Sequence, residues 1–159
     1  MAGCNEGFCN AVLLLHRAKS ESSSLDIAPL GPYEESTRLM PTLIRYGLKG
    51  ELPPLVNPDV AHDYVYVEDV VDAYLLAATK PSQERTGIQT SLRKVVDVAR
   101  QVMGIAVEPK WGSMPNRNWD TSVWIADNRK IRETLGWHPR YSFEEGFRLT
   151  EEWFRQDVI

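Results

Sequence analysis

Short β-prone segments alternate with longer amphipathic segments along this chain, and that alternation restricts the fold more than any other feature. Such alternation is typical of α/β proteins, in which helices pack on the faces of a sheet. The predicted strands are residues 25–30, 64–67, 105–110 and 122–126. The predicted helices are residues 5–18, 37–50, 68–79, 91–103, 127–135 and 142–154. The strands are few for 159 residues, so we expect the chain to be part of something larger.

Capping residues predict where several helices begin and end. Ser36 or Thr37 is expected to cap the second helix, with Pro41 in its first turn and Gly50 as its stop. The apolar stripe of residues 91–103 is the most regular in the chain, and a glycine follows it at once.

The last helix begins with a capping-box pattern. Ser142 is followed three residues later by Glu145, the spacing at which the two side chains satisfy each other's backbone N–H groups. Trp137 and Trp153 are expected to pack in the core, as aromatic side chains in helices and strands usually do.

Composition and charge exclude several classes of function. A net charge of -4 argues against nucleic-acid binding through bulk electrostatics, and no apolar run is long enough to span a bilayer. Cys4 and Cys9 lie too close together to staple a fold, so we expect free thiols and a cytoplasmic protein. Cysteine and histidine spacing matches no metal-ligand pattern.

Three stretches, in order, resemble segments of the extended short-chain dehydrogenases/reductases. The stretches are 31–35 with 38–44, then 62–71, then 117–120 with 124–127 and 135–139. The chain is therefore similar to NAD-dependent nucleotide-sugar epimerases and dehydratases. The resemblance implies a truncated fold, in which residues 1–32 are a remnant helix and strand of the nucleotide-binding Rossmann half. Residues 33–159 would form the small mixed α/β substrate-binding lobe.

Two motifs of that family are missing from this chain. The glycines near the start fit no Gly-rich cofactor turn, and Tyr46 and Lys49 are one residue too close for the family's Tyr-x-x-x-Lys pair. The resemblance aligns residues 5–20 with the helix that follows the catalytic lysine. We therefore expect no catalytic residue, no NAD or NADP site and no metal site in this chain, and no activity by the chain alone.

The resemblance also supplies candidate substrate-binding residues. Arg117 matches an arginine that clamps the diphosphate of a nucleotide sugar, and Asp120 matches a carboxylate that accepts from a ribose hydroxyl. Arg38 and Leu39 fall where the family contacts the base or sugar. His62 replaces a phosphate-binding arginine and is a weaker donor.

Plain structural roles compete with each of these assignments. The alternatives are a surface ion pair for Arg117 and Asp120, a solvated arginine over a buried leucine at 38–39, and a locally satisfied histidine at 62. Trp119 is the one tryptophan in a polar loop, where it would contact a base.

Two other functions fit the same residues. The apolar helix around Ala11 and Leu15 matches a family helix of the dimer interface, which would make the chain a homodimeric interaction module. The chain would otherwise be one half of a split enzyme completed by a separate Rossmann chain. The resemblance also implies that this chain has lost a family strand before Thr86.

Overall fold

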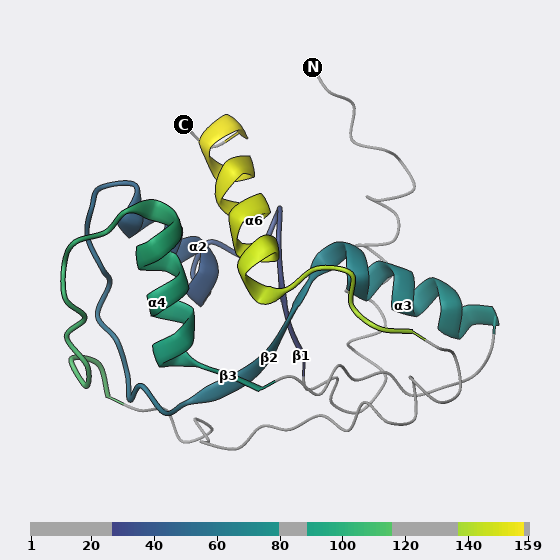
Figure 1. The fold of residues 1–159 in the computed structure, drawn as a ribbon, viewed down its shortest axis with the longest axis horizontal. Helices are drawn as coiled ribbons and strands as arrows, with labels where there is room; N and C mark the ends of the chain where they lie inside the picture. Colours follow the sequence, from purple (N-terminus) through teal and green to yellow (C-terminus); the bar gives the residue numbers. More distant parts are fainter. Residues whose placement is uncertain (1–26, 80–88, 116–136, 158–159) are drawn as a thin grey trace.

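The computed structural model describes residues 27–79, 89–115 and 137–157. These residues form three strands and four helices, which confirms the α/β class (Figure 1). In chain order they are β1 (Ile27–Leu30), α2 (Leu39–Gly47), β2 (Ala61–Tyr66), α3 (Val67–Thr79), β3 (Gln89–Ser91), α4 (Leu92–Met103) and α6 (Phe143–Asp157). The expected helices over 5–18 and 127–135, the strand over 122–126 and the strand loss before Thr86 lie outside the described residues.

The described strands form one sheet in the order β1-β2-β3. β1 runs parallel to β2, with Ile27 opposite Asp63 and Leu30 opposite Tyr66. β3 pairs with β2 in the antiparallel sense and places Ser91 opposite Ala61. The sheet is therefore mixed, and β2 lies at its centre among the described residues.

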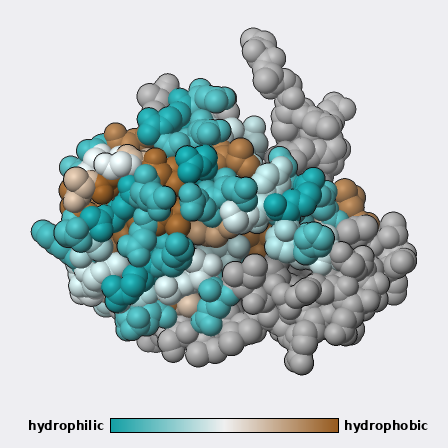
Figure 2. All heavy atoms as spheres, in the orientation of Figure 1, coloured by the Kyte–Doolittle hydropathy of each residue, from teal (hydrophilic) through white to brown (hydrophobic). Residues whose placement is uncertain are grey.

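Helices α2, α4 and α6 pack against one another, and α6 also lies across β1 and β2 (Figure 1). Hydrophobic side chains reach the surface in a strip between α4 and α6 (Figure 2). The most deeply buried apolar residues of this core are Leu30, Met40, Leu43, Ile44, Leu55, Val95, Val96, Val98, Ala99 and Phe147. Helix α3 continues directly from β2 and shares a smaller cluster, Ala73 with Trp137.

The start of α6 approaches β2 very closely. Gly146 has no side chain, and a Cβ atom placed there would lie 3.1 Å from the Cβ of Tyr66. The aromatic rings of Tyr66 and Tyr141 then pack edge to face with their centroids 5.0 Å apart. This contact fixes the first turn of α6 over the sheet.

The helix boundaries agree with the local capping signals in two cases. Ser91 caps α4 by accepting from the N–H of Lys94, and Gly104 ends it with a left-handed φ of 68°. At α6 the N–H and hydroxyl of Ser142 both donate to the Glu145 carboxylate, while the Ser142 hydroxyl accepts from the Glu145 N–H. The predicted capping box is confirmed.

The predicted cap of α2 is wrong. Arg38 occupies the N-cap position and makes no side-chain capping bond, while the Thr37 hydroxyl donates to Glu35 instead. Pro41 does lie in the first turn. The helix ends at Gly47, three residues before Gly50, because the chain then makes tighter turns through that glycine.

The predicted strand over residues 105–110 is also wrong, because no strand forms there. Ile105 is buried, but its carbonyl accepts from the Arg100 side chain. Arg100 also pairs with Glu108 at 2.6 Å, and Val107 is exposed. The segment therefore folds back on the end of α4 rather than joining the sheet.

Candidate functional site

His62 and Tyr64 project from the same face of β2. Side chains two residues apart on a strand share a face, and both residues are partly buried. Their ring centroids lie 5.8 Å apart, and the Tyr64 ring also meets Phe143 at the start of α6 at 5.5 Å. Tyr64 is thus held between its strand neighbour and the first turn of a helix.

The loop of residues 31–38 connects β1 to α2 and turns sharply twice. Gly31 has a φ of 152°, and Tyr33 has a φ of 64°, which is uncommon for a residue with a side chain. The turn sends the Tyr33 ring outward, where it packs on Trp153 of α6 with centroids 5.0 Å apart. The next side chain, Glu34, is turned inward.

Glu34 and Arg38 form the charged part of this loop. The side chain of Glu34 keeps 11% of its surface exposed and that of Arg38 keeps 41%, and Glu34 Oε1 lies 3.5 Å from Arg38 Nε. Burial raises the pKa of Glu34 to about 7, although the charge of Arg38 opposes the rise. Glu34 therefore exchanges its proton near neutral pH.

Tyr64 lies within reach of both of these charges. Burial raises the pKa of the Tyr64 phenol far above its usual value, the negative charge of Glu34 raises it further, and Arg38 acts in the opposite direction. The phenol consequently stays protonated across the physiological range. Tyr64 is a neutral hydrogen-bonding group beside one cation and one titrating carboxyl.

The structure brings two of the predicted site residues to this place. The charge of Arg38 acts on the pKa of Tyr64 together with that of Glu34, and the ring of His62 contacts the ring of Tyr64. Leu39 packs against the hydrophobic core and is only partly buried. Arg117 and Asp120 lie outside the described residues, and so does Trp119.

Sequence reasoning missed Glu34 and Tyr64. The alternation of β2 could have identified Tyr64, because it must share a face with His62. Nothing in the sequence marked Glu34, since its burial depends on the left-handed turn at Tyr33.

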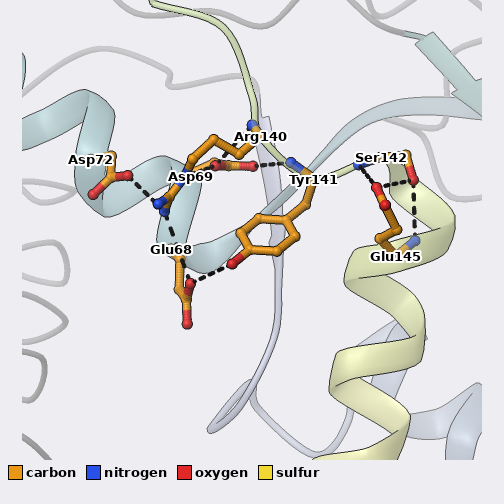
Figure 3. A network of polar contacts seen from close by, with 7 residues as sticks. All are labelled: Glu68, Asp69, Asp72, Arg140, Tyr141, Ser142 and Glu145. Carbon is orange, nitrogen blue, oxygen red and sulfur yellow. Dashed lines mark hydrogen bonds and ion pairs between the residues drawn. The ribbon is translucent and has the colours of Figure 1, made fainter.

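A second polar network ties the segment before α6 to the start of α3 (Figure 3). The buried carboxylate of Asp69 accepts from the backbone N–H groups of Arg140 and Tyr141, both at 3.1 Å. The Arg140 side chain also pairs with Asp69 at 3.3 Å and with Asp72 at 2.7 Å. The hydroxyl of Tyr141 donates to Glu68, which raises the pKa of that phenol. This network holds secondary structure together, and its acidic residues are already paired.

An open cleft of about 700 Å³ lies between β3, the start of α4 and the start of α6. Its charged lining is mixed: Asp59, Lys94 and Glu144 all contribute. Of the predicted substrate-binding residues that the structure describes, Arg38, Leu39 and His62 all lie outside this lining. The cleft therefore does not coincide with the cluster around Tyr64.

Within the described residues, no strand runs through a glycine-rich turn into a helix. The loop after β1 holds the single glycine Gly31, and β2 and β3 run directly into α3 and α4. Val67 packs closely against Gly31, since a Cβ atom there would lie 2.5 Å from Val67 Cγ1. These connections therefore lack the turn that would cradle the pyrophosphate of a dinucleotide.

Within residues 27–79, 89–115 and 137–157, no group of three or more potential metal ligands is placed to hold an ion. Across the same residues, every helix is too short or too polar to cross a bilayer.

Comparison with known proteins shows the family of the chain. The model of the GDP-mannose 4,6 dehydratase family matches residues 28–150. The UDP-glucose 4-epimerase of Mycolicibacterium smegmatis is 36% identical over 98 residues, which cover 58% of this chain and 31% of that protein. The dTDP-glucose 4,6-dehydratase 1 of Escherichia coli K12 is 30% identical over 137 residues, which cover 78% of this chain and 38% of that protein.

A solved structure shows the same arrangement of elements. The crystal structure of UDP-glucose 4-epimerase from Thermotoga maritima with UDP-glucose has a TM-score of 0.70 at 31% identity. The match covers 82% of this chain and 44% of that structure. The chain thus spans less than half the length of each of these three relatives.

The fold is that of the NAD-dependent extended short-chain dehydrogenase/reductase class, and the chain covers part of it. By sequence it belongs to the GDP-mannose 4,6 dehydratase family of nucleotide-sugar epimerases and dehydratases.

Proposed function

We propose that this chain carries the nucleotide-sugar-binding part of an epimerase or dehydratase and binds a UDP- or dTDP-hexose. Arg38 and His62, Leu39 between the loop and the core, and Arg117 with Asp120 are the proposed binding residues. The observation that supports the proposal most directly is that Arg38 stays 41% exposed beside Glu34, while His62 contacts the ring of Tyr64, whose pKa both charges affect. Relatives that act on UDP-glucose and dTDP-glucose support the substrate class.

Each proposed residue supplies a defined interaction. The Arg38 guanidinium is partly exposed, so its remaining N–H groups can donate to a diphosphate or a sugar hydroxyl. The Tyr64 phenol, held neutral, can donate as well as accept. His62 supplies at most one donor when neutral, so Arg38 and Arg117 would carry the charge of the diphosphate.

We further propose that the chain does not catalyse hydride transfer alone. Its sequence lacks the Tyr-x-x-x-Lys pair and the Gly-rich turn, and residues 1–32 are proposed as the remnant of the nucleotide-binding half. Assembly through the helix around Ala11 and Leu15, or with a separate Rossmann chain, stays a prediction, because that helix lies outside the described residues.

Calorimetric titration tests the proposal. UDP-glucose or dTDP-glucose should bind, and NAD should give no binding heat. Titrations with CDP- and GDP-sugars measure how strongly the chain discriminates between nucleotides. The variant Arg38→Gln should weaken nucleotide-sugar binding about tenfold, the loss expected for one charge-assisted hydrogen bond. Arg155→Gln is the matched control, because Arg155 is similarly exposed but pairs with Glu151 on α6. Binding of NAD in place of every nucleotide sugar would overturn the proposal.

A further inference from the structure

One buried polar atom has no partner in the part of the chain that the structure describes. It is Oε2 of Glu34. An unpaired buried carboxylate oxygen is costly, because the ion loses its hydration without gaining a hydrogen bond. Such an atom is tolerated when the group can become neutral.

The bond between Glu34 and Arg38 is loose. The separation of 3.5 Å exceeds the usual length of about 2.8 Å for a charge-assisted N–H···O bond. Arg38 stands at the N-cap of α2 on extended backbone and makes no side-chain capping bond, so among the described residues only Glu34 pairs with its guanidinium. A solvent-borne anion can therefore compete for Arg38 without disturbing the helix.

The two members of the pair differ in their access to solvent. Arg38 is almost half exposed, whereas Glu34 is almost fully covered. The left-handed backbone of Tyr33 and the packing of its ring on Trp153 hold Glu34 in that position. If Arg38 turns to an outside anion, Glu34 stays behind without its countercharge.

We propose that Glu34 is a proton-linked gate on Arg38. The ionised carboxylate holds the guanidinium, and a bound nucleotide diphosphate takes the guanidinium while Glu34 takes up one proton from solvent. The gate rests on the proposed function, because it requires an anionic ligand at Arg38. The proton joins a carboxylate oxygen of Glu34, and no covalent bond of the ligand changes.

The surrounding groups favour this exchange. From α2, Arg38 is the charge that lowers the pKa of Glu34, and its removal would let that pKa rise above about 7. From β2, Tyr64 remains neutral and adds no charge, while His62, a second titratable side chain on that face, contacts the Tyr64 ring. From α6, the residue packed on the loop is Trp153, which is also uncharged. A diphosphate nearby would raise the pKa of Glu34 further by charge repulsion.

The linkage fixes the direction of the pH effect. Because the complex binds more protons than the free protein above pH 7, binding must weaken as the pH rises. Between pH 6.5 and 8.5 the dissociation constant for UDP-glucose should increase roughly tenfold. UDP-glucose is the probe, because its diphosphate is esterified at both ends and does not titrate in that range.

Calorimetry in two buffers measures the proton directly. At pH 7.5, up to about one proton should be taken up from the buffer per ligand bound. The binding enthalpies measured in HEPES and in Tris should therefore differ by that number of protons multiplied by the difference between the ionisation enthalpies of the two buffers. Glu34→Gln should abolish both the proton uptake and the loss of affinity with pH. Glu35→Gln is the matched control, because Glu35 is the exposed neighbour and accepts a hydrogen bond from the Thr37 hydroxyl. It should leave both effects intact.

The outcomes separate the gate from the proposed function. Binding of UDP-glucose with equal heats in the two buffers, or undiminished uptake in Glu34→Gln, overturns the gate and leaves the binding function standing. If UDP-glucose does not bind at any pH, the proposed function fails and the gate fails with it. If Glu34→Gln does not fold, the two-buffer comparison is made with His62→Asn, because an imidazole beside the diphosphate would also take up a proton. Proton uptake that persists in His62→Asn supports the gate, and uptake that is lost overturns it.

Discussion

The carboxyl of Glu34 shows how one residue can be set by its neighbours rather than by its own type. It follows a tyrosine with left-handed backbone, it is mostly buried, and one of its oxygens is unpaired. A carboxyl whose folded pKa lies above its unfolded value favours folding while it is protonated. That contribution is complete below about pH 4.5 and is lost as the pH rises through about 7.

Replacing Glu34 with glutamine should therefore stabilise the protein at alkaline pH. Glutamine keeps the shape without the buried charge, so the free energy of unfolding at pH 8.5 should rise by up to about 3 kcal/mol, with little change at pH 4.5. Urea unfolding at the two pH values measures the difference. Glu35→Gln should shift neither value by more than about 0.5 kcal/mol. An equal effect of Glu34→Gln at both pH values would contradict the assignment of the shift to this carboxyl.

Asp69 and Asp72 offer a comparison between a buried and an exposed carboxylate that share Arg140. Asp69 is buried and accepts two backbone N–H bonds as well, whereas 43% of the Asp72 side chain is exposed. Asp69→Ala should lower the free energy of unfolding by about 3 kcal/mol, because it leaves two backbone donors unpaired.

Asp72→Ala is the control at the same arginine. It removes only an exposed ion pair, so it should cost less than about 1 kcal/mol. Chemical denaturation at neutral pH compares the two variants. Equal losses would mean that Arg140, rather than the backbone of the segment before α6, is what Asp69 stabilises.

At the scale of elements, predictability follows the range of the interactions. The extent of helix α4 was predicted because its apolar stripe and Gly104 are local signals, whereas its cap, Ser91, was predicted to lie inside the helix. The three-residue strand β3 was missed, since it is polar and exists only by pairing with β2. Residues 105–110 look like a strand by composition, yet Arg100 and the turn at Gly104 fold them back on α4.

The contact of α6 with β2 has a consequence at Gly146. Alanine within a helix is normally more stable than glycine by about 1 kcal/mol. Here the added Cβ would lie 3.1 Å from the Cβ of Tyr66, an atom fixed to a central strand, so the crowding should exceed that gain. We expect Gly146→Ala to lower the unfolding free energy by about 1 kcal/mol.

Thermal unfolding of Gly146→Ala against Glu152→Ala provides the comparison. Glu152 is exposed on the same helix, so its replacement by alanine tests helix propensity without crowding and should be neutral or slightly stabilising. A stabilised Gly146→Ala would show that α6 can move away from the sheet at little cost.

At the scale of the whole molecule, the family and the α/β class were predictable because the three matched stretches keep their order along the chain. The site was predictable only in part. Arg38 and His62 were predicted as binding residues, but Tyr64, which contacts His62 and whose pKa Arg38 affects, takes its position from the register of a strand. The roles of Arg117 and Asp120 stay predictions that binding must test.

Ligand binding should be visible in the stability of the entire chain. A ligand that binds only the folded state at one hundred times its dissociation constant stabilises it by about 2.7 kcal/mol. For a chain of this size that corresponds to a rise in Tm of roughly 5–10 °C. UDP-glucose should produce this rise at pH 6.5 and a smaller one at pH 8.5, while NAD at the same concentration should produce none.

Two variants control for the site of binding. Arg38→Gln should reduce the rise in Tm at pH 6.5, and Arg155→Gln should preserve it. A rise with NAD that matches or exceeds the rise with UDP-glucose would mean that the chain holds a dinucleotide site, although the described connections between strands and helices contain no glycine-rich turn.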